Sequence, residues 1–232
     1  MKELFSILVM ALCTYGISAQ EKEVTKFLGI PVDGYKAEMR KKLIEKGFTP
    51  KTVKGSEFFE GEFNGHDVRV YIVTDNNKVW RIMLCDKNTC GETDIKIRFN
   101  NLCRQFDKNE RYVIGKLDGT DYIIPEKEDI SYEMLVHNKR YEASYYQVLD
   151  KATIDAITIP EDKVRGLLKD LGNIENPTEE QLKNAEDLGM ASLAFDMTRK
   201  KSVWFIISES YGSYYITMYY DNEYNHSDGE DL

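Results

Sequence analysis

The chain is poor in the residues that form metal sites and lacks the motifs that mark well-known enzymes. It has three histidines and four cysteines in 232 residues. His66, His137 and His226 are far apart, and none forms a paired zinc-ligand spacing with a cysteine. No Gly-x-Ser-x-Gly, His-Glu-x-x-His, Walker or dinucleotide-binding motif occurs. We therefore expect no metal site, no cofactor and no catalytic residue of these classes.

Basic residues are fewer than acidic residues. There are 31 Lys and Arg against 40 Asp and Glu, which gives a formal net charge of -9. This is a poor match for a nucleic-acid backbone. A content of 42% hydrophobic and 12% aromatic residues excludes a wholly disordered chain. We expect a globular protein with no nucleic-acid partner and, beyond its N-terminus, no segment long enough to span a membrane.

The one long apolar run lies at the N-terminus. Lys2 precedes the run 4–12, and the small residues Ser18 and Ala19 follow it. This order predicts a secretory signal peptide, residues 1–19, with cleavage after Ala19 and Gln20 as the mature N-terminus. The alternative is a buried N-terminal helix, but the run is not amphipathic. Lipid attachment at Cys13 is disfavoured, because Leu12 stands where a small residue is needed. We expect a secreted or periplasmic protein.

The mature chain then keeps three cysteines. An odd number in an exported protein allows one disulfide and one free thiol. Cys85 and Cys90 flank a short loop and can close as a local disulfide. Cys103 falls on the apolar face of a predicted helix, so we expect a buried thiol there.

A helix followed by three strands is predicted in residues 20–92. Asp33 is the expected N-cap of the helix, and Gly47 is its stop. The dipeptide Asn64-Gly65 favours a tight hairpin between the first two strands. The helix face comprises Tyr35, Met39 and Leu43, and the strands span 59–63, 68–73 and 79–84.

A second unit of the same kind is predicted in residues 93–221. Its helix begins near Thr93-Asp94, and segments 132–136 and 140–149 are its first two strands. The segment 201–207 resembles 77–83, which places Trp204 and Trp80 in the third strands of their units. We interpret this as a degenerate duplication, the alternative being coincidence. The expected helix face comprises Ile95, Phe99, Leu102, Cys103 and Phe106.

A helical insertion, residues 150–195, interrupts the second unit. Pro160 opens one helix, which ends at Gly172, and Asn176 is the expected N-cap of the next, with Pro177 in its first position. A closing hairpin turns at 211–213, and residues 222–232 form an acidic tail. Asp221, Glu223 and Asn225 alternate as calcium ligands do, but the glycine and the final glutamate of a calcium loop are missing, so a solvated tail is favoured.

Five segments of the chain carry a resemblance: Phe27–Gly34, Lys46–Phe48, Glu60–Gly65, Asp94–Leu102 and Tyr219–Asn225. They resemble segments of a group of uncharacterised secreted proteins of Bacteroides-type gut bacteria. The resemblance covers most of the mature chain except the helical insertion, and it implies no established activity or site. The helix-plus-strands layout is also similar to β-lactamase-inhibitor-type and PepSY-type domains, a likeness of fold alone.

Tyrosine is abundant in the last strands. Strand alternation places Tyr215 and Tyr219 on one face with Thr217, and Ile216 and Met218 on the other. If the apolar face meets the helices, the first two tyrosines form an outer aromatic surface suited to contact with a protein or a glycan. Tyr145 on the earlier long strand can extend it if the strands are neighbours. The alternative is that these tyrosines are simply good strand formers.

The sequence thus predicts an α+β fold, an antiparallel sheet with helices on one face. Trp80 and Trp204 are each expected to fill core beneath the helix of their own unit. The preferred function is an exported binding or protein-interaction module whose candidate binding residues are Tyr145, Tyr215 and Tyr219. The alternative is a carboxylate-dependent hydrolase acting on a glycan or peptide, which requires two carboxylates that converge in a cleft.

Overall fold

The computed structural model describes residues 23–116, 120–170, 172 and 176–226. The expected signal peptide with its cleavage site and Cys13, and the tail residues 227–232, lie outside the described residues. None of the helices in the described ranges combines the length and the apolar character that crossing a bilayer requires.

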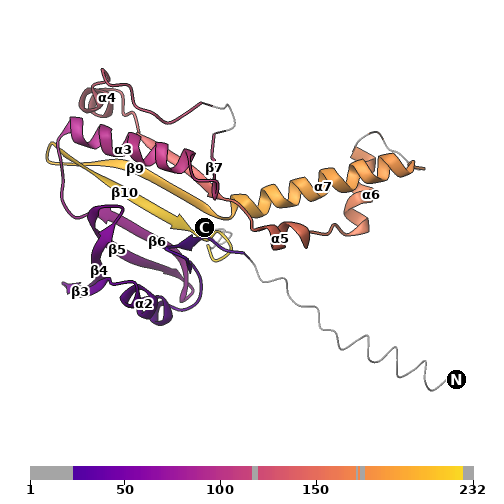
Figure 1. Cartoon of the computed structure of the whole chain (residues 1–232), viewed down its shortest axis with the longest axis horizontal. Helices are drawn as coiled ribbons and strands as arrows, with labels where there is room; N and C mark the ends of the chain where they lie inside the picture. The colour runs from indigo at the N-terminus through magenta and orange to yellow at the C-terminus, as the bar shows by residue number, and fades with distance from the viewer. Residues whose placement is uncertain (1–22, 117–119, 171, 173–175, 227–232) are drawn as a thin grey trace.

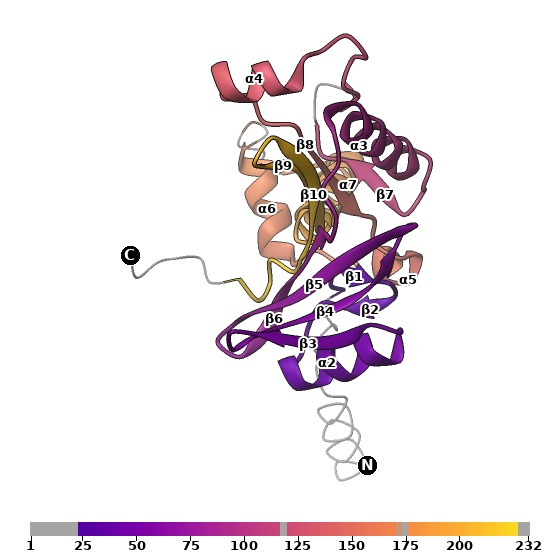
Figure 2. The same cartoon turned by 90° about the vertical axis from the view of Figure 1, so that its left-hand side faces the viewer.

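The fold is α+β, as predicted. Eight antiparallel strands form one sheet in the order β3-β4-β5-β6-β10-β9-β8-β7, and β1 (Lys26–Phe27) and β2 (Ile30–Pro31) form a small separate hairpin. Figure 2 shows how strongly the large sheet twists between its two halves. Its strands are β3 (Thr49–Val53), β4 (Ser56–Phe63), β5 (His66–Asp75), β6 (Lys78–Asp86), β7 (Tyr112–Ile114), β8 (Glu142–Gln147), β9 (Ser202–Ser210) and β10 (Ser213–Asp221).

Each half of the sheet has the same layout. The helix α2 (Lys36–Glu45) precedes the meander β3 to β6, and α3 (Glu92–Asp107) precedes the strands β7 to β10. The halves meet where β6 pairs with β10. The first half has one strand, β3, more than the sequence predicts, and the second half has the predicted four, with β7 in place of segment 132–136. Trp80 therefore lies in the fourth strand of its half and Trp204 in the third. The two tryptophan segments therefore do not occupy equivalent strands.

The core lies between the sheet and the helices α2 and α3. All five residues predicted for the α3 face are buried, as are Met39 and Leu43 of α2. Tyr35, by contrast, is 53% exposed. The helices pack on the inward side chains of the strands, whose members include Val70, Ile82, Leu84, Phe205 and Ile216.

Several local predictions are confirmed and others need correction. Asn64 and Gly65 form the β4–β5 turn with positive φ angles of 54° and 77°. Asp33 is not the N-cap of α2, because Tyr35 occupies that position and the Asp33 carboxylate accepts instead from Gly34 N. The segment 132–136 is not a strand. It belongs to the helix α4 (Ile130–Val136), which Asp129 caps by accepting from Tyr132 N.

The helical insertion lies between β8 and β9, as expected. It contains α5 (Lys151–Asp155), α6 (Glu161–Asp170) and α7 (Glu179–Arg199), and Figure 1 shows α6 and α7 projecting from one end of the sheet. Thr178, not Asn176, is the N-cap of α7, because its side chain forms a reciprocal capping box with Gln181. The pair is held by a small cluster of its own: Val164, Leu168 and Ala185, with Ile159 and Leu167.

Candidate functional site on the outer face of the sheet

The face of the sheet opposite α2 and α3, here called the outer face, carries a row of large side chains across five adjacent strands. Met83 on β6 is paired with Tyr71 on one side and with Tyr219 on the other. Tyr219 is in turn paired with Trp204, and the Phe58 ring lies 5.8 Å from that of Tyr71. All five side chains are half-buried. We call Phe58, Tyr71, Met83, Tyr219 and Trp204 the aromatic row.

Trp80 and Trp204 are not in the core beneath the helices, which corrects the sequence prediction. Val79 and Val203 point inward and are fully buried, so the tryptophans that follow them turn to the outer face. The β5–β6 register shifts at Val73, which is opposite Arg81, while the next residue pairs with Val79. Trp80 is thus the extra residue of a bulge, and the bulge sends both Trp80 and Arg81 outward.

An ion pair fixes the centre of this surface. Arg81 donates to both carboxylate oxygens of Asp221 at 2.6 and 2.7 Å, and Trp204 Nε1 donates to the same carboxylate at 2.9 Å. The Arg81 guanidinium lies 4.1 Å from the Trp80 ring centroid and 4.7 Å from that of Tyr219. Tyr219 and Trp204 stack at 4.0 Å with 16° between their planes. These side chains are therefore held in fixed positions.

The first part of the expected acidic tail is anchored beside this cluster. Asn222 is fully buried, and its backbone N–H donates to Trp80 O. Asn225 donates to the Asp33 carboxylate and to Val79 O. His226 then lies with its ring 4.4 Å from that of Trp80. Residues 222–226 are therefore not a loose tail, because their amide groups satisfy backbone groups of the sheet.

The predicted binding residues separate into two groups. Tyr215 and Tyr219 lie half-buried on the outer face, whereas Ile216 and Met218 are buried on the other side, as alternation predicts. Tyr145 does not extend the strip, because β9 separates β8 from β10 and its ring is 1% exposed in the core. Its hydroxyl donates to Asp107 at 3.1 Å. Trp204 pairs directly with Tyr219, but the sequence does not reveal it as a surface residue, because a Val-Trp pair in an apolar strand predicts a core position.

The local disulfide that the sequence allows is not formed, since Cys85 and Cys90 are free cysteines. Cys85 lies beside Tyr71 on the outer face, while Cys90 packs against the core, so the two side chains leave opposite sides of the sheet. Burial raises the pKa of both thiols. Cys103 is buried as predicted, and burial raises its pKa to about 12. None of these environments favours a reactive thiolate.

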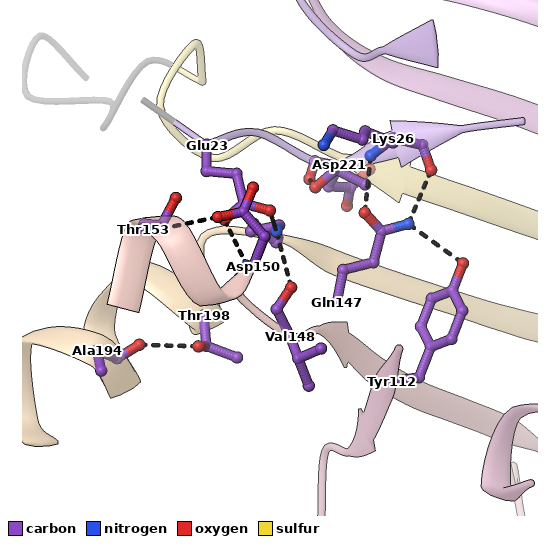
Figure 3. A network of polar contacts seen from close by, with 12 residues as sticks. Glu23, Lys26, Tyr112, Gln147, Val148, Asp150, Thr153, Ala194, Thr198 and Asp221 are labelled. Carbon is purple, nitrogen blue, oxygen red and sulfur yellow. Dashed lines mark hydrogen bonds and ion pairs between the residues drawn. The ribbon is translucent and has the colours of Figure 1, made fainter. Parts of the chain in front are cut away.

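A polar network on the opposite side of the sheet ties the N-terminal segment to the fold (Figure 3). Lys201 is 1% exposed and pairs with Glu23, and its ammonium also donates to Val148 O at 3.0 Å. Burial lowers the Lys201 pKa, and Glu23 opposes that shift. The Gln147 amide bonds to both backbone groups of Lys26 at 2.7 Å. These groups find their partners within the chain, so we assign the network a structural role.

The carboxylates give the hydrolase alternative no support. Among the described residues, the carboxyl groups with displaced pKa values are Glu60, Glu128 and Asp150, and all three pKa values are lowered. Lys87 causes the shift at Glu60, Lys139 and Tyr141 cause that at Glu128, and Thr153 causes that at Asp150. A general acid that works near neutral pH requires a raised pKa instead.

Known proteins offer no further guide to the role of this surface. The chain matches no family model, no curated protein and no solved structure.

Proposed function

We propose that the protein is an exported module that binds a protein partner through the outer face of its sheet. The observation that carries the proposal is the aromatic row, with Arg81 and Trp80 beside it. Aromatic residues, methionine and arginine are the types enriched where proteins meet, and tryptophan, tyrosine and arginine dominate binding energy. Because Asp221 and the ring stack hold these groups in place, little side-chain entropy is lost on binding.

The ring geometry favours a protein over a glycan in the centre of this face. A sugar stacks on an exposed ring face, whereas the Tyr219 ring in the centre of the row stacks on Trp204 and has the Arg81 guanidinium 4.7 Å from its centroid. Arg81 lies over the Trp80 ring in the same way. Stacked rings that stand on a sheet present edges, which suit the mixed apolar and polar contacts of a protein interface.

Matched arginine substitutions test the proposal. We expect Met83→Arg, in the middle of the aromatic row, to weaken capture of a protein partner by at least about 30-fold, or ~2 kcal/mol, because it places a charge in the interface. Ile97→Arg, at an exposed position on α3, is the control and should bind as the wild type does. The mature chain serves as bait against the exported proteins of the producing cell, and affinity is then measured on the captured protein.

The comparison has clear adverse outcomes. Equal capture by wild type and Met83→Arg, with unchanged melting temperatures, would show that the partner docks elsewhere. Capture of glycans alone would replace the protein partner with a carbohydrate.

Export is part of the proposal and has its own test. We expect N-terminal sequencing of the exported protein to begin at Gln20, because small residues follow the apolar run 4–12. A mature protein that still carries residues 4–12 would overturn the assignment to a secreted or periplasmic location.

A further inference from the structure

A pocket of about 840 Å³ lies at the sheet edge beyond the aromatic row, and its lining runs from Trp204 and Ser144 to the core residues Phe99, Tyr141 and Ala143. On β10 the cross-strand partner of Trp204 is Tyr219, which stacks on it, but on β8 its partner is Ser144. Next beyond Ser144 is Gly115, whose N–H donates to Ser144 O at 2.8 Å. Serine and glycine are too short to cover an indole, so the row ends in a trough beside Trp204.

The walls of this trough are held in place from several directions. Trp204 is fixed by its stack on Tyr219 and by its bond to Asp221. Tyr122 also lines the pocket, and its hydroxyl is hydrogen-bonded to that of Ser144 at 3.0 Å. A Cβ at Gly115 would lie 2.3 Å from Ser144 Oγ. Glycine is therefore required for the backbone at position 115 to lie this close to Ser144. The pocket is therefore present before any ligand arrives.

The charges around the pocket cancel. Arg140 pairs with Glu142 at 3.0 Å, Lys139 pairs with Glu128, and the Lys116 ammonium donates to the backbone carbonyl of Asp121 at 2.7 Å. The lining thus contains three cations and three carboxylates: Lys116, Lys139 and Arg140, with Asp121, Glu128 and Glu142. A phosphate or a nucleotide would need an excess of positive charge, so a neutral ligand is favoured.

We propose that this pocket binds a neutral saccharide ring, whose C–H face stacks on Trp204. Ser202 and Tyr146 line the pocket with Ser144 and supply hydroxyl groups beside that ring. An aromatic platform with a few fixed polar groups is the usual composition of a small-ligand site. The saccharide site goes beyond the proposed protein interface and is a second site, at the edge of the same face.

The test uses Trp204 as its own reporter. The chain has two tryptophans, so in a Trp80→Phe background the tryptophan fluorescence comes from Trp204 alone. The probes are maltoheptaose, cellohexaose, xylohexaose and chitohexaose, up to about 20 mM, which exceeds the ~1 mM range of weak binding. We expect at least one probe to change the emission with a saturable curve. Adenosine monophosphate, the anionic control, should bind more weakly.

Substitutions at Ser144 show whether binding requires the open space beside Trp204 or the Ser144 hydroxyl. Ser144→Val fills the trough with a strand-forming side chain and should weaken binding at least tenfold, whereas Ser144→Ala leaves it open and should retain most binding. If Ser144→Val fails to fold by circular dichroism, Ser202→Val takes its place. No response to any probe, tighter binding of adenosine monophosphate, or undiminished binding by a folded valine variant would overturn the proposal. Met83→Arg should not alter saccharide binding, so this test can fail independently of the protein interface.

Discussion

Replacing Arg81 with methionine is expected to reduce the free energy of unfolding by about 3–5 kcal/mol. Asp221 is 2% exposed, and Arg81 supplies two of the hydrogen bonds that compensate its negative charge. Without the guanidinium the carboxylate stays buried, and among the described residues Trp204 Nε1 is its remaining side-chain donor. Urea denaturation, with the midpoint and slope both measured, reports the loss.

Two further variants separate the ion pair from simple loss of packing. Arg81→Met combined with Asp221→Leu should be more stable than Arg81→Met alone, because no unpaired charge then remains buried. Arg81→Lys should fall between wild type and Arg81→Met, since an ammonium cannot bond both carboxylate oxygens in a planar fork. If Arg81→Met and the double variant lose the same free energy of unfolding, an unpaired Asp221 charge is not the cause of the loss, which would contradict the role given to the ion pair.

Alkaline pH should unfold the protein through its buried tyrosines. Burial is the main cause that raises the pKa values of Tyr141, Tyr145 and Tyr220, and Glu128 adds to the effect at Tyr141. The unfolded chain ionises these groups near pH 10, while the folded chain keeps their protons. Their contribution is therefore complete below pH 10 and is lost as pH rises toward the folded pKa values, by up to ~1.4 kcal/mol per pH unit for each group.

Together the three tyrosines give an expected slope of about −4 kcal/mol per pH unit between roughly pH 10 and 12. Lys201 acts in the opposite direction, because its pKa is lowered and the strain of holding its charge is relieved as pH rises toward the unfolded value. Because Lys201 is one group and the tyrosines are three, the free energy of unfolding falls as pH rises. Tyr145→Phe should reduce the slope by ~1.4 kcal/mol per pH unit, as followed by urea melts at several pH values. An unchanged slope in this variant would contradict the account.

Local sequence patterns predict much of the fold. The α3 face is predicted residue by residue because five apolar side chains repeat at helical spacing, and all five are buried. Asn64-Gly65 predicts its hairpin because few other dipeptides tolerate two positive φ angles. Segment 132–136 was predicted as a strand because its apolar residues are consecutive, and the deciding feature, the Asp129 cap, lies just before it.

The outer face was harder to predict. Alternation correctly places Tyr215 and Tyr219, because it is a local property of one strand. The bulge that turns Trp80 and Arg81 to the same side arises from pairing between β5 and β6. The Arg81–Asp221 pair joins residues 140 positions apart, through a β6–β10 pairing that no local pattern specifies. Tyr145 was misplaced for the same reason, since its distance from β10 depends on the strand order.

The most direct test of the central claim is site-specific photo-crosslinking in producing cells. A benzoylphenylalanine is placed at position 83, in the middle of the aromatic row, and in a second strain at position 97 on α3. The account predicts a covalent adduct with another protein from position 83 and none from position 97. Adducts from position 97 alone, from both positions equally, or from neither would contradict the assignment of the outer face as a protein-binding surface.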